Sequence, residues 1–356
     1  MKITVSILAI IFTSIGFLSC NPVEPEVKAT GISLDKTELT LVQGDSVTLT
    51  AAVLPAKAKP VVVWSSSNEK VATVVNGKVK TLARGTATIK VTADSVFSAT
   101  CAIVVTHEDL PYQLVWSDEF DGPALDLTKW SYETGGGGFG NQEKQYYTNR
   151  PENIRVENGS LIIEAKKESY NGNNYTSARI NSKDKVSFTY GRMEARISLP
   201  VGKGTWPAYW MMGSNITAVR WPLCGEIDIM EHVGSKPTMI SHAVHTSEKN
   251  GSKGNNWYSQ KTVAGVENEY HTYAIEWEEK ANEGDDNMSF LIDGVKSATI
   301  WEQHVNSTVK MWPFKSDFYF LLNLAIGGTM GGTVDDAIFN NPVLMKVDYV
   351  RVYQRK

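Results

Sequence analysis

Three carboxylates and a histidine stand close together in GEIDIMEHVG, residues 225–234, where most of the other side chains are apolar. On a regular strand Glu226 and Asp228 point to one face and Glu231 to the other, because successive side chains alternate. One extra residue, a β-bulge at Ile229–Met230, would bring all three acids to the same face. Bulges are frequent beside active sites, so the broken alternation predicts a bulge that gathers these carboxylates.

Acids in an apolar run need an explanation, because burying carboxylates without partners is costly. A purely structural role would require a cation for each of them, and no Lys or Arg occurs from Cys224 to Gly234. Paired carboxylates suit the hydrolysis of glycosidic bonds, in which one attacks carbon or activates water and the other protonates the leaving oxygen. A gap of about 5–5.5 Å would permit retention, and a wider gap inversion. Asp228 would help to keep one glutamate protonated, and the pattern leaves open which one.

The composition is that of a globular protein large enough for two domains, with 356 residues, 42% of them hydrophobic, and a formal net charge of -4. The chain has no long Lys/Arg block, so we expect no nucleic-acid partner. Cys101 and Cys224 give no disulfide framework, and we expect them to be buried free thiols.

The N-terminus has the layout of a secretory signal: one Lys, the apolar run ITVSILAIIFTSIGFL, then Ser19 and Cys20. FLSC followed by Asn21 resembles the lipobox of bacterial lipoproteins, in which the Cys becomes the lipid-modified first residue. The resemblance implies a signal peptide over 1–19 and an exported lipoprotein anchored to a bacterial membrane through Cys20, on the cell surface or the periplasmic face. An ordinary signal with an incidental Cys is the alternative. Residues 20–29, rich in Pro and Glu, suit a short tether.

Residues 30–106 show short alternating strands, such as GTATIKVTA, separated by turns at Gly44-Asp45 and Asn76-Gly77. This pattern predicts a small β-sandwich. WSSSNEKVATV, NGKV and GTATIKVTA resemble the bacterial Ig-like group 2 module. The segment has no cluster of acids or histidines, so we expect a spacer or adhesive module.

Residues 107–111 are predicted to be a linker, and the second domain, 111–356, begins at YQLVWSDEFDG. Segments such as YGRMEARISL, TWPAYWMMG and FYFLLNLAIGG predict strands, and helical periodicity is almost absent. So many strands in one domain imply two large packed sheets or a barrel. The sequence therefore predicts an all-β protein.

The second domain resembles glycoside hydrolase family 16, in its laminarinase-like branch. EIDIME is similar to the family signature ExDxxE, and the likeness extends from about Leu114 to Gln354 through WSDEFDG, GNQEKQYYT, SARI, YGRMEARI, GTWPAYWMM, SHAVHT and NLAIGG. The resemblance implies a concanavalin A-like β-jelly-roll sandwich that cuts internal β-linkages with retention. It assigns Glu226 as the nucleophile, Asp228 as its assisting acid and Glu231 as the acid/base.

The resemblance also marks residues around these acids. His245 in ISHAVHT stands where a His of laminarinase-like relatives lies close to the acid/base, and an ordinary hydrogen-bonding role is the alternative. Sugar rings present apolar faces and polar edges, so a glycan cleft needs aromatic platforms together with amide and guanidinium groups. A tryptophan can equally belong to the core of a sandwich. The expected substrate-binding residues are Asn141, Arg179, Trp206, Trp210, Trp221 and Asn323.

No cofactor is expected for catalysis. His242 and His245 face opposite sides of a regular strand and no HExxH-type spacing occurs, so a catalytic zinc is not expected. Members of the family often bind a structural calcium, whose ligands by position would be Glu119, Gly159 and Asp348, and oxygen-only ligation suits calcium. A plain salt bridge is the alternative explanation for Asp348.

The stretch GGTMGG, residues 327–332, departs from the family pattern, because Met330 stands where many laminarinases carry Trp. We expect a monomeric, retaining endo-β-glucanase that acts on β-glucan polysaccharide. Laminarin-type β-1,3-glucan is expected first and mixed-linkage β-1,3-1,4-glucan close behind. The alternatives are a glycan-binding lipoprotein without catalysis and a transglycosylase that uses the same carboxylates.

Overall fold

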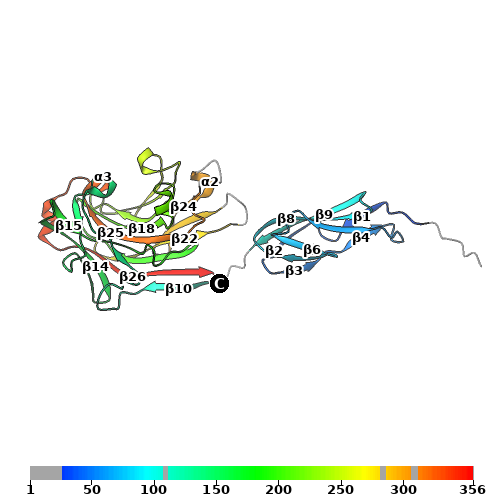
Figure 1. Cartoon of the computed structure of the whole chain (residues 1–356), viewed down its shortest axis with the longest axis horizontal. Coiled ribbons are helices and arrows are strands. Elements are labelled where there is room, and N and C mark those ends of the chain that lie inside the picture. The colour runs from blue at the N-terminus through cyan, green and yellow to red at the C-terminus, as the bar shows by residue number, and fades with distance from the viewer. Residues whose placement is uncertain (1–25, 107–110, 281–285, 306–311, 356) are drawn as a thin grey trace, which may run out of the picture. The chain divides into compact units, whose positions relative to one another are not determined.

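The computed structural model describes residues 26–106, 111–280, 286–305 and 312–355 (Figure 1). The chain divides into two compact units between Val104 and Val105, except that Arg84–Thr86 group with the second unit. The described parts of both units are built almost entirely from strands, which confirms the all-β expectation. The predicted signal peptide, Cys20 and most of the predicted linker lie outside the described residues. A search of the described residues finds no helix with the length and apolar character of a membrane span.

In residues 26–106, short strands form three small sheets, in the orders β1-β4, β2-β9-β8-β5 and β3-β7-β6. Alternate residues of the longer strands are buried, among them Ile89 and Val91 of β8 and Cys101 of β9, so each strand turns one face to the core. The strands are β1 (Gly31–Leu34), β2 (Glu38–Val42), β3 (Ser46–Thr48), β4 (Ala51–Leu54), β5 (Val62–Ser66), β6 (Ala72–Val75), β7 (Lys78–Thr81), β8 (Gly85–Ala93) and β9 (Phe97–Thr106).

The described part of the second unit contains a large sheet in the order β12-β15-β14-β26-β17-β22-β23-β24, with β10 paired to β26 and β13 to β14. Its strands are β10 (Tyr112–Asp118), β12 (Gln145–Tyr147), β13 (Ile154–Glu157), β14 (Ser160–Tyr170), β15 (Asn173–Ser177), β17 (Gly191–Ser198), β22 (Tyr270–Glu278), β23 (Asn287–Ile292), β24 (Val295–Trp301) and β26 (Val343–Arg355). Neighbouring strands are antiparallel, except for β12 and β15.

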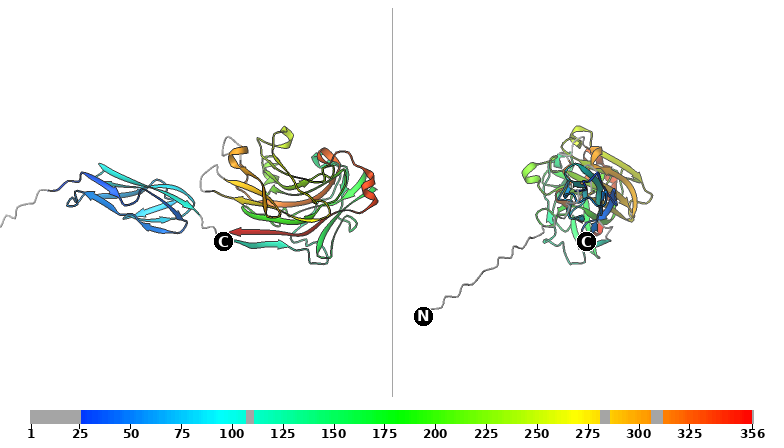
Figure 2. Two further views of the ribbon diagram at one scale, coloured as in Figure 1. Left: turned by 180° about the vertical axis from the view of Figure 1, so that it is seen from behind. Right: turned by 90° about the vertical axis from the view of Figure 1, so that its right-hand side faces the viewer.

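A second sheet has the order β11-β16-β25-β18-β19-β20-β21, and Figure 2 shows the two sheets of this unit as stacked layers. Its strands are β11 (Ser131–Tyr132), β16 (Arg179–Asn181), β18 (Thr205–Gly213), β19 (Glu226–His232), β20 (Met239–His245), β21 (Trp257–Thr262) and β25 (Phe318–Ile326). Short helical turns join the strands: η1 (Gly138–Gly140), α1 (Ile216–Val219), η2 (Gly251–Lys253), α2 (Glu302–Val305), α3 (Gly328–Gly331) and η4 (Asp336–Asn340).

One continuous core lies between the two sheets of the second unit. Met193, Ile275 and Val350 enter it from the larger sheet, and Tyr209 and Phe320 from the smaller one. Packing of two apolar sheet faces is the arrangement of a β-sandwich, which confirms the predicted jelly roll. The other face of the smaller sheet is thereby left for polar side chains.

The predicted β-bulge is present in β19. Between β18 and β19, Trp210 is opposite Asp228 and Ala208 is opposite Glu231, so β19 advances three residues while β18 advances two. The pairing of β19 with β20 shifts at the same place. Ile229 and Met230 are consecutive and both fully buried in the core, so the alternation restarts after them.

Candidate active site

Glu226, Asp228 and Glu231 share the face of β19 that points away from the core, because the bulge returns Glu231 to the side of the other two. Asp228 and Glu231 are only 4% and 7% exposed, and within the described parts of the chain no Lys or Arg forms an ion pair with any of the three acids. Burial raises the pKa of each carboxyl group to about 8, and the charge of Asp228 adds to the rise for both glutamates. Because the three groups repel one another's charge, the cluster favours keeping a proton on one of them while another is ionised.

His245 faces Glu226 across the β19–β20 pair. The backbone N–H of Gly251 donates to its Nδ1 at 3.0 Å, so in the neutral ring the proton is on Nε2. Nε2 lies 3.1 Å from Oδ2 of Asp228 and 3.7 Å from Oε1 of Glu226. The ring therefore presents a proton to these acids and no free lone pair to a metal ion, although the three groups lie within 4.8 Å of one another.

His242, on the opposite face of β20, fixes the bulge. Its Nδ1 lies 2.7 Å from the carbonyl oxygen of Ile229 and its Nε2 lies 2.9 Å from the hydroxyl of Ser297 in β24. A carbonyl only accepts, so Nδ1 is the donor and Nε2 accepts from the serine. Burial lowers the pKa of His242 to about 4, and the ring stacks on Phe290. A neutral histidine thus connects the bulge to the facing sheet.

Trp206 holds the side chain of Glu231. Its Nε1 donates to Oε1 of Glu231 at 3.0 Å, and the tryptophan is 8% exposed. The hydroxyl of Ser241, across the β19–β20 pair, donates to the backbone oxygen of Glu231 at 3.3 Å. In this structure Trp206 orients an acid, and its expected contact with a sugar stays a prediction.

Arg179, Trp210 and Asn323 form one group on β16, β18 and β25. The guanidinium of Arg179 lies 4.9 Å from the ring centre of Trp210 and donates through Nε to Glu133 at 2.8 Å. Nε1 of Trp210 donates to Oδ1 of Asn323 at 2.8 Å. The guanidinium of Arg179 also lies 5.1 Å from the ring centre of Phe139. This group pairs an aromatic ring with a cation and an amide, which are the groups that recognise sugars.

Glu143, Gln145 and Tyr147 extend this group and were not singled out from the sequence. Tyr147 accepts from Nδ2 of Asn323 at 3.2 Å and donates to Glu143 at 2.9 Å. Gln145 and Asn141 also donate to Glu143, at 2.7 and 3.3 Å. The available signal was the period of two in EKQYY, which puts these three side chains on one face.

Trp221 lies in the turn before β19, outside the regular strands. Its ring centre is 6.1 Å from that of His245. In the described residues its buried Nε1 has no hydrogen-bond partner. Buried N–H groups are usually paired, so this unpaired one is unusual.

The acids expected to bind calcium each have an arginine partner. Glu119 accepts two hydrogen bonds from Arg351, at 3.0 and 2.7 Å, and Oδ2 of Asp348 accepts from Arg196 at 2.7 Å. The salt bridge that was the alternative for Asp348 is thus present. Gly159 has a φ of 72° in the turn between β13 and β14.

Strand pairing nevertheless brings these three residues to one place. Strand β10 pairs with residues 350–355 of β26, and β14 pairs with residues 343–347 of the same strand, which leaves a gap at residues 348–349. Glu119 follows the end of β10 and Gly159 precedes β14, so both flank the position of Asp348. Calcium prefers backbone and carboxylate oxygens, so a gap flanked by these three residues is compatible with an oxygen-ligated cation.

A jelly roll whose polar sheet face carries clustered, buried carboxyl groups is the arrangement of a glycoside hydrolase, which needs one carboxylate and one carboxylic acid. Residues 141–349 match the model of glycosyl hydrolases family 16, and residues 28–104 match that of the bacterial Ig-like domain (group 2). The chain therefore belongs to glycosyl hydrolases family 16.

Relatives and solved structures agree with this assignment. A beta-glucanase of Rhodothermus marinus is 45% identical over 251 residues, which are 68% of this chain and 85% of that protein. The laminarinase from Flavobacterium sp. UMI-01 is 44% identical, with a TM-score of 0.61 over 68% of this chain and 100% of its own. SCLam, a non-specific endo-beta-1,3(4)-glucanase, is 41% identical, with a TM-score of 0.62 over 69% of this chain and 93% of its own.

Proposed function

We propose that this glycoside hydrolase is a retaining endo-β-glucanase that cleaves internal β-1,3 bonds of laminarin-type glucans and also accepts mixed-linkage β-1,3-1,4-glucan. The observation that carries the proposal is the bulge in β19, which gathers Glu226, Asp228 and Glu231 without a Lys or Arg partner in the described residues. The similarity to glucanases of both kinds supports the substrate class.

In the first step, a carboxylate oxygen of Glu226 forms a bond to the anomeric carbon while the bond from that carbon to the glycosidic oxygen breaks. Glu231 gives its proton to the departing oxygen. Oε1 of Glu231 accepts from Trp206, which leaves Oε2 to carry that proton. Burial favours the protonated form, as a general acid requires.

In the second step, Glu231 is a carboxylate and takes a proton from water, whose oxygen attacks the anomeric carbon. The bond to Glu226 breaks, and two inversions give net retention. We assign Asp228 and His245 to positioning: Nε2–H of His245 faces both Asp228 and Glu226 and stabilises their negative charge. No catalytic cofactor takes part in the family's reaction.

Sugar units are proposed to bind along the face of the smaller sheet. Trp210 and Arg179 supply an aromatic surface and a cation, and Asn323 and Asn141 supply amides. Trp221 is proposed to donate its unpartnered N–H to a hydroxyl beside the acids.

A structural calcium is proposed at the gap beside β26, held by backbone oxygens at Glu119 and Gly159 and by the carboxylate of Asp348. This carboxylate would exchange its partner Arg196 for the ion. When bound, calcium would tie the end of β10 to the start of β14 and stabilise the fold.

We also propose that the protein is an exported, monomeric lipoprotein anchored through Cys20, with the Ig-like unit as a spacer from the membrane. The lipobox-like FLSC supports this. In a bacterial host, Cys20→Ala is expected to move the protein from the membrane to the soluble fraction. Membrane retention of this variant would contradict lipid anchoring.

The function is tested by incubating the protein with laminarin, curdlan, lichenan, agarose and xyloglucan, with Glu231→Gln as the blank. We expect new reducing ends from laminarin and curdlan, fewer from lichenan, and none from the blank. Binding of laminarin without new reducing ends would overturn the hydrolase in favour of a binding protein. Glycosyl transfer in place of hydrolysis, seen when an acceptor sugar is added, would identify a transglycosylase.

A further inference from the structure

The Ig-like unit has one end at which the chain enters it. Strand β1 starts there, and its first residue, Gly31, is opposite the last residue of β4, Leu54. The first residue of β5, Val62, is opposite the last residue of β8, Ala93, and residues 55–61 join β4 to β5. Figure 1 shows β1 and β4 at this end of the unit. We call residues 54–61 and 94–96 the tether end, because the predicted tether leads into it.

Large apolar side chains are exposed at the tether end. Leu54 is 58% exposed, Val61 70% and Val96 74%. Turns usually carry glycine, proline and short polar residues, so two exposed valines in turns are unusual. Exposed apolar side chains that gather in one place mark a surface that a partner covers.

Hydrogen bonds tie the turns of the two valines together. The backbone N–H of Val61 donates to Oδ1 of Asp94 at 2.8 Å, and the backbone N–H of Asp94 donates to the carbonyl oxygen of Val61 at 2.9 Å. The N–H of Val96 closes its own turn on the carbonyl oxygen of Ala93 at 3.1 Å. The apolar side chains are therefore presented on a firm backbone and need no partner to order them.

Two lysines stand in the loop PAKAKP, residues 55–60, that leads to Val61. Ala58 is 8% exposed, and its backbone N–H donates to a carbonyl oxygen of the same loop at 2.9 Å, so the middle of the loop is anchored. Lys57 and Lys59, on either side of it, are exposed. No Asp or Glu occurs in residues 46–68. The loop is therefore a cationic extension of the apolar surface.

The charge around the tether end is positive. Lys28, in the segment that leads into β1, is exposed and adds a third cation. The described acids at this end and in that segment are Glu26 and Asp94, and Oδ1 of Asp94 is occupied by the N–H of Val61. The whole chain has a formal net charge of -4, so this end differs from it in sign. Lysines beside valines suit a surface with an apolar interior and anionic head groups.

The tether end is also where the chain arrives from the proposed lipid anchor. The N–H of Thr30 donates to the carbonyl oxygen of Leu54 at 2.7 Å, which fixes the point of entry. Thr30 is ten positions after Cys20, and ten residues span at most about 35 Å. Acyl chains on Cys20 would thus keep the tether end at a high local concentration beside a bilayer, so a weak contact suffices.

From these observations we propose that the tether end binds the surface of an anionic phospholipid bilayer, with Leu54, Val61 and Val96 at the level of the head groups and Lys57 and Lys59 on the phosphates. The proposal rests on the proposed lipid anchor, which brings this surface to a bilayer. It gives the Ig-like unit a binding role in addition to that of a spacer. A cationic, partly apolar contact adds to the binding free energy of acyl chains.

The test uses residues 20–356 with Cys20→Ala, so that both units are present and no acyl chain contributes. Flotation measures the partition coefficient on vesicles of phosphatidylcholine with and without phosphatidylglycerol. We expect binding to the anionic vesicles that weakens as salt is added, and much less binding to pure phosphatidylcholine. Lys57→Gln and Lys59→Gln should each reduce the partition coefficient about fivefold, and Val61→Ser and Val96→Ser about threefold each.

Matched controls are available on the same unit. Lys78→Gln and Lys80→Gln, on β7, remove the same charge roughly 20 Å along the strands from Leu54, which is more than the Debye length of about 8 Å. Val104→Ser removes an exposed valine toward the other end of β9. These controls should bind vesicles as the parent chain does.

Absence of binding to the anionic vesicles, or equal losses in the variants and their controls, would overturn the proposal. Dimerisation that Val61→Ser abolishes would also overturn it, because a second copy would then cover the surface. Failure of the lipid anchor is seen separately: a salt wash should release the Cys20→Ala variant from cell membranes, and resistance to the wash would contradict the anchor but leave the vesicle result standing. Unchanged thermal unfolding verifies that each variant is folded.

Discussion

Replacing Glu231 by glutamine should stabilise the protein while abolishing its activity. Burial raises the pKa of Glu231 from 4.5 to about 8, so the folded state disfavours the charged form. Ionising the buried carboxyl therefore reduces the free energy of unfolding. This penalty is absent below the unfolded pKa of 4.5, grows as the pH rises above 4.5, and stops growing above about 8. At pH 6, one and a half units above 4.5, it amounts to about 2 kcal/mol, and at pH 8 to about 5 kcal/mol. The amide avoids this penalty and can still accept from Trp206.

The assay is urea unfolding of wild type and Glu231→Gln between pH 4.5 and 8, followed by tryptophan fluorescence, since every tryptophan except Trp64 belongs to the second unit. The variant's advantage should increase by about 1.4 kcal/mol per pH unit. Glu194→Gln is the matched control, because Glu194 is equally buried but pairs with Arg192. It should lose stability. If Glu231→Gln were no more stable than wild type at any pH, the account of a strained catalytic acid would be wrong.

Three further outcomes are expected. His242→Ala should leave the Ile229 carbonyl buried without the histidine donor, which lowers the free energy of unfolding by about 1–3 kcal/mol. Because the bulge positions Glu231, kcat should fall while KM changes less. An unchanged kcat would contradict the role of His242 at the bulge. The kcat/KM of wild type for laminarin should decline as the pH rises through about 8, because Glu231 loses its proton; a profile that is flat up to pH 10 would exclude this acid. EDTA should lower the Tm of wild type, added calcium should restore it, and Asp348→Asn should show neither response; equal curves with and without calcium would refute the metal site.

The catalytic strand could be predicted from sequence because its information is local. Alternation on a strand is strict, so the spacing of Glu226, Asp228 and Glu231 required one extra residue, and burial of Ile229 and Met230 supplied it. The strands of the second unit were predictable for the same reason, since each shows its own pattern, whereas the jelly roll was implied by the resemblance to the family.

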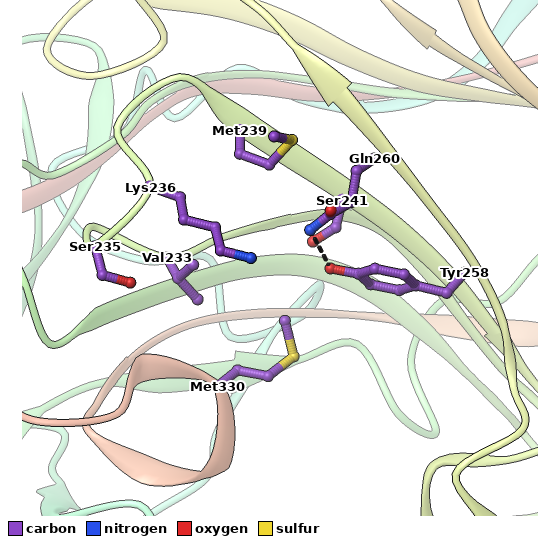
Figure 3. Close-up of a pocket in the computed structure, with 8 residues that line it drawn as sticks. All are labelled: Val233, Ser235, Lys236, Met239, Ser241, Tyr258, Gln260 and Met330. Atoms are coloured by element: carbon purple, nitrogen blue, oxygen red, sulfur yellow. Dashed lines mark hydrogen bonds between the residues drawn. The ribbon is translucent and has the colours of Figure 1, made fainter.

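Features assembled from distant segments could not be derived in this way. Asn323 and Tyr147 are 176 positions apart, and no pattern in either segment indicates that they share a hydrogen bond. The hydrogen bond from Trp206 to Glu231 could not be foreseen, because an indole N–H directed at a carboxylate depends on the register of β18 and β19. A pocket of about 220 Å³ that Met239, Gln260 and Met330 help to line (Figure 3) similarly needs β20, β21 and α3 in place before it exists.

The central claim, that the bulge makes Glu226 the nucleophile and Glu231 the acid/base, is tested most directly by azide rescue with an activated aryl β-laminaribioside. In Glu231→Ala, azide should attack the covalent intermediate and release the β-glycosyl azide. In Glu226→Ala, azide should take the place of the nucleophile and give the α-glycosyl azide by a single inversion. The opposite pair of anomers, or rescue of neither variant while wild type is active, would contradict the assignment.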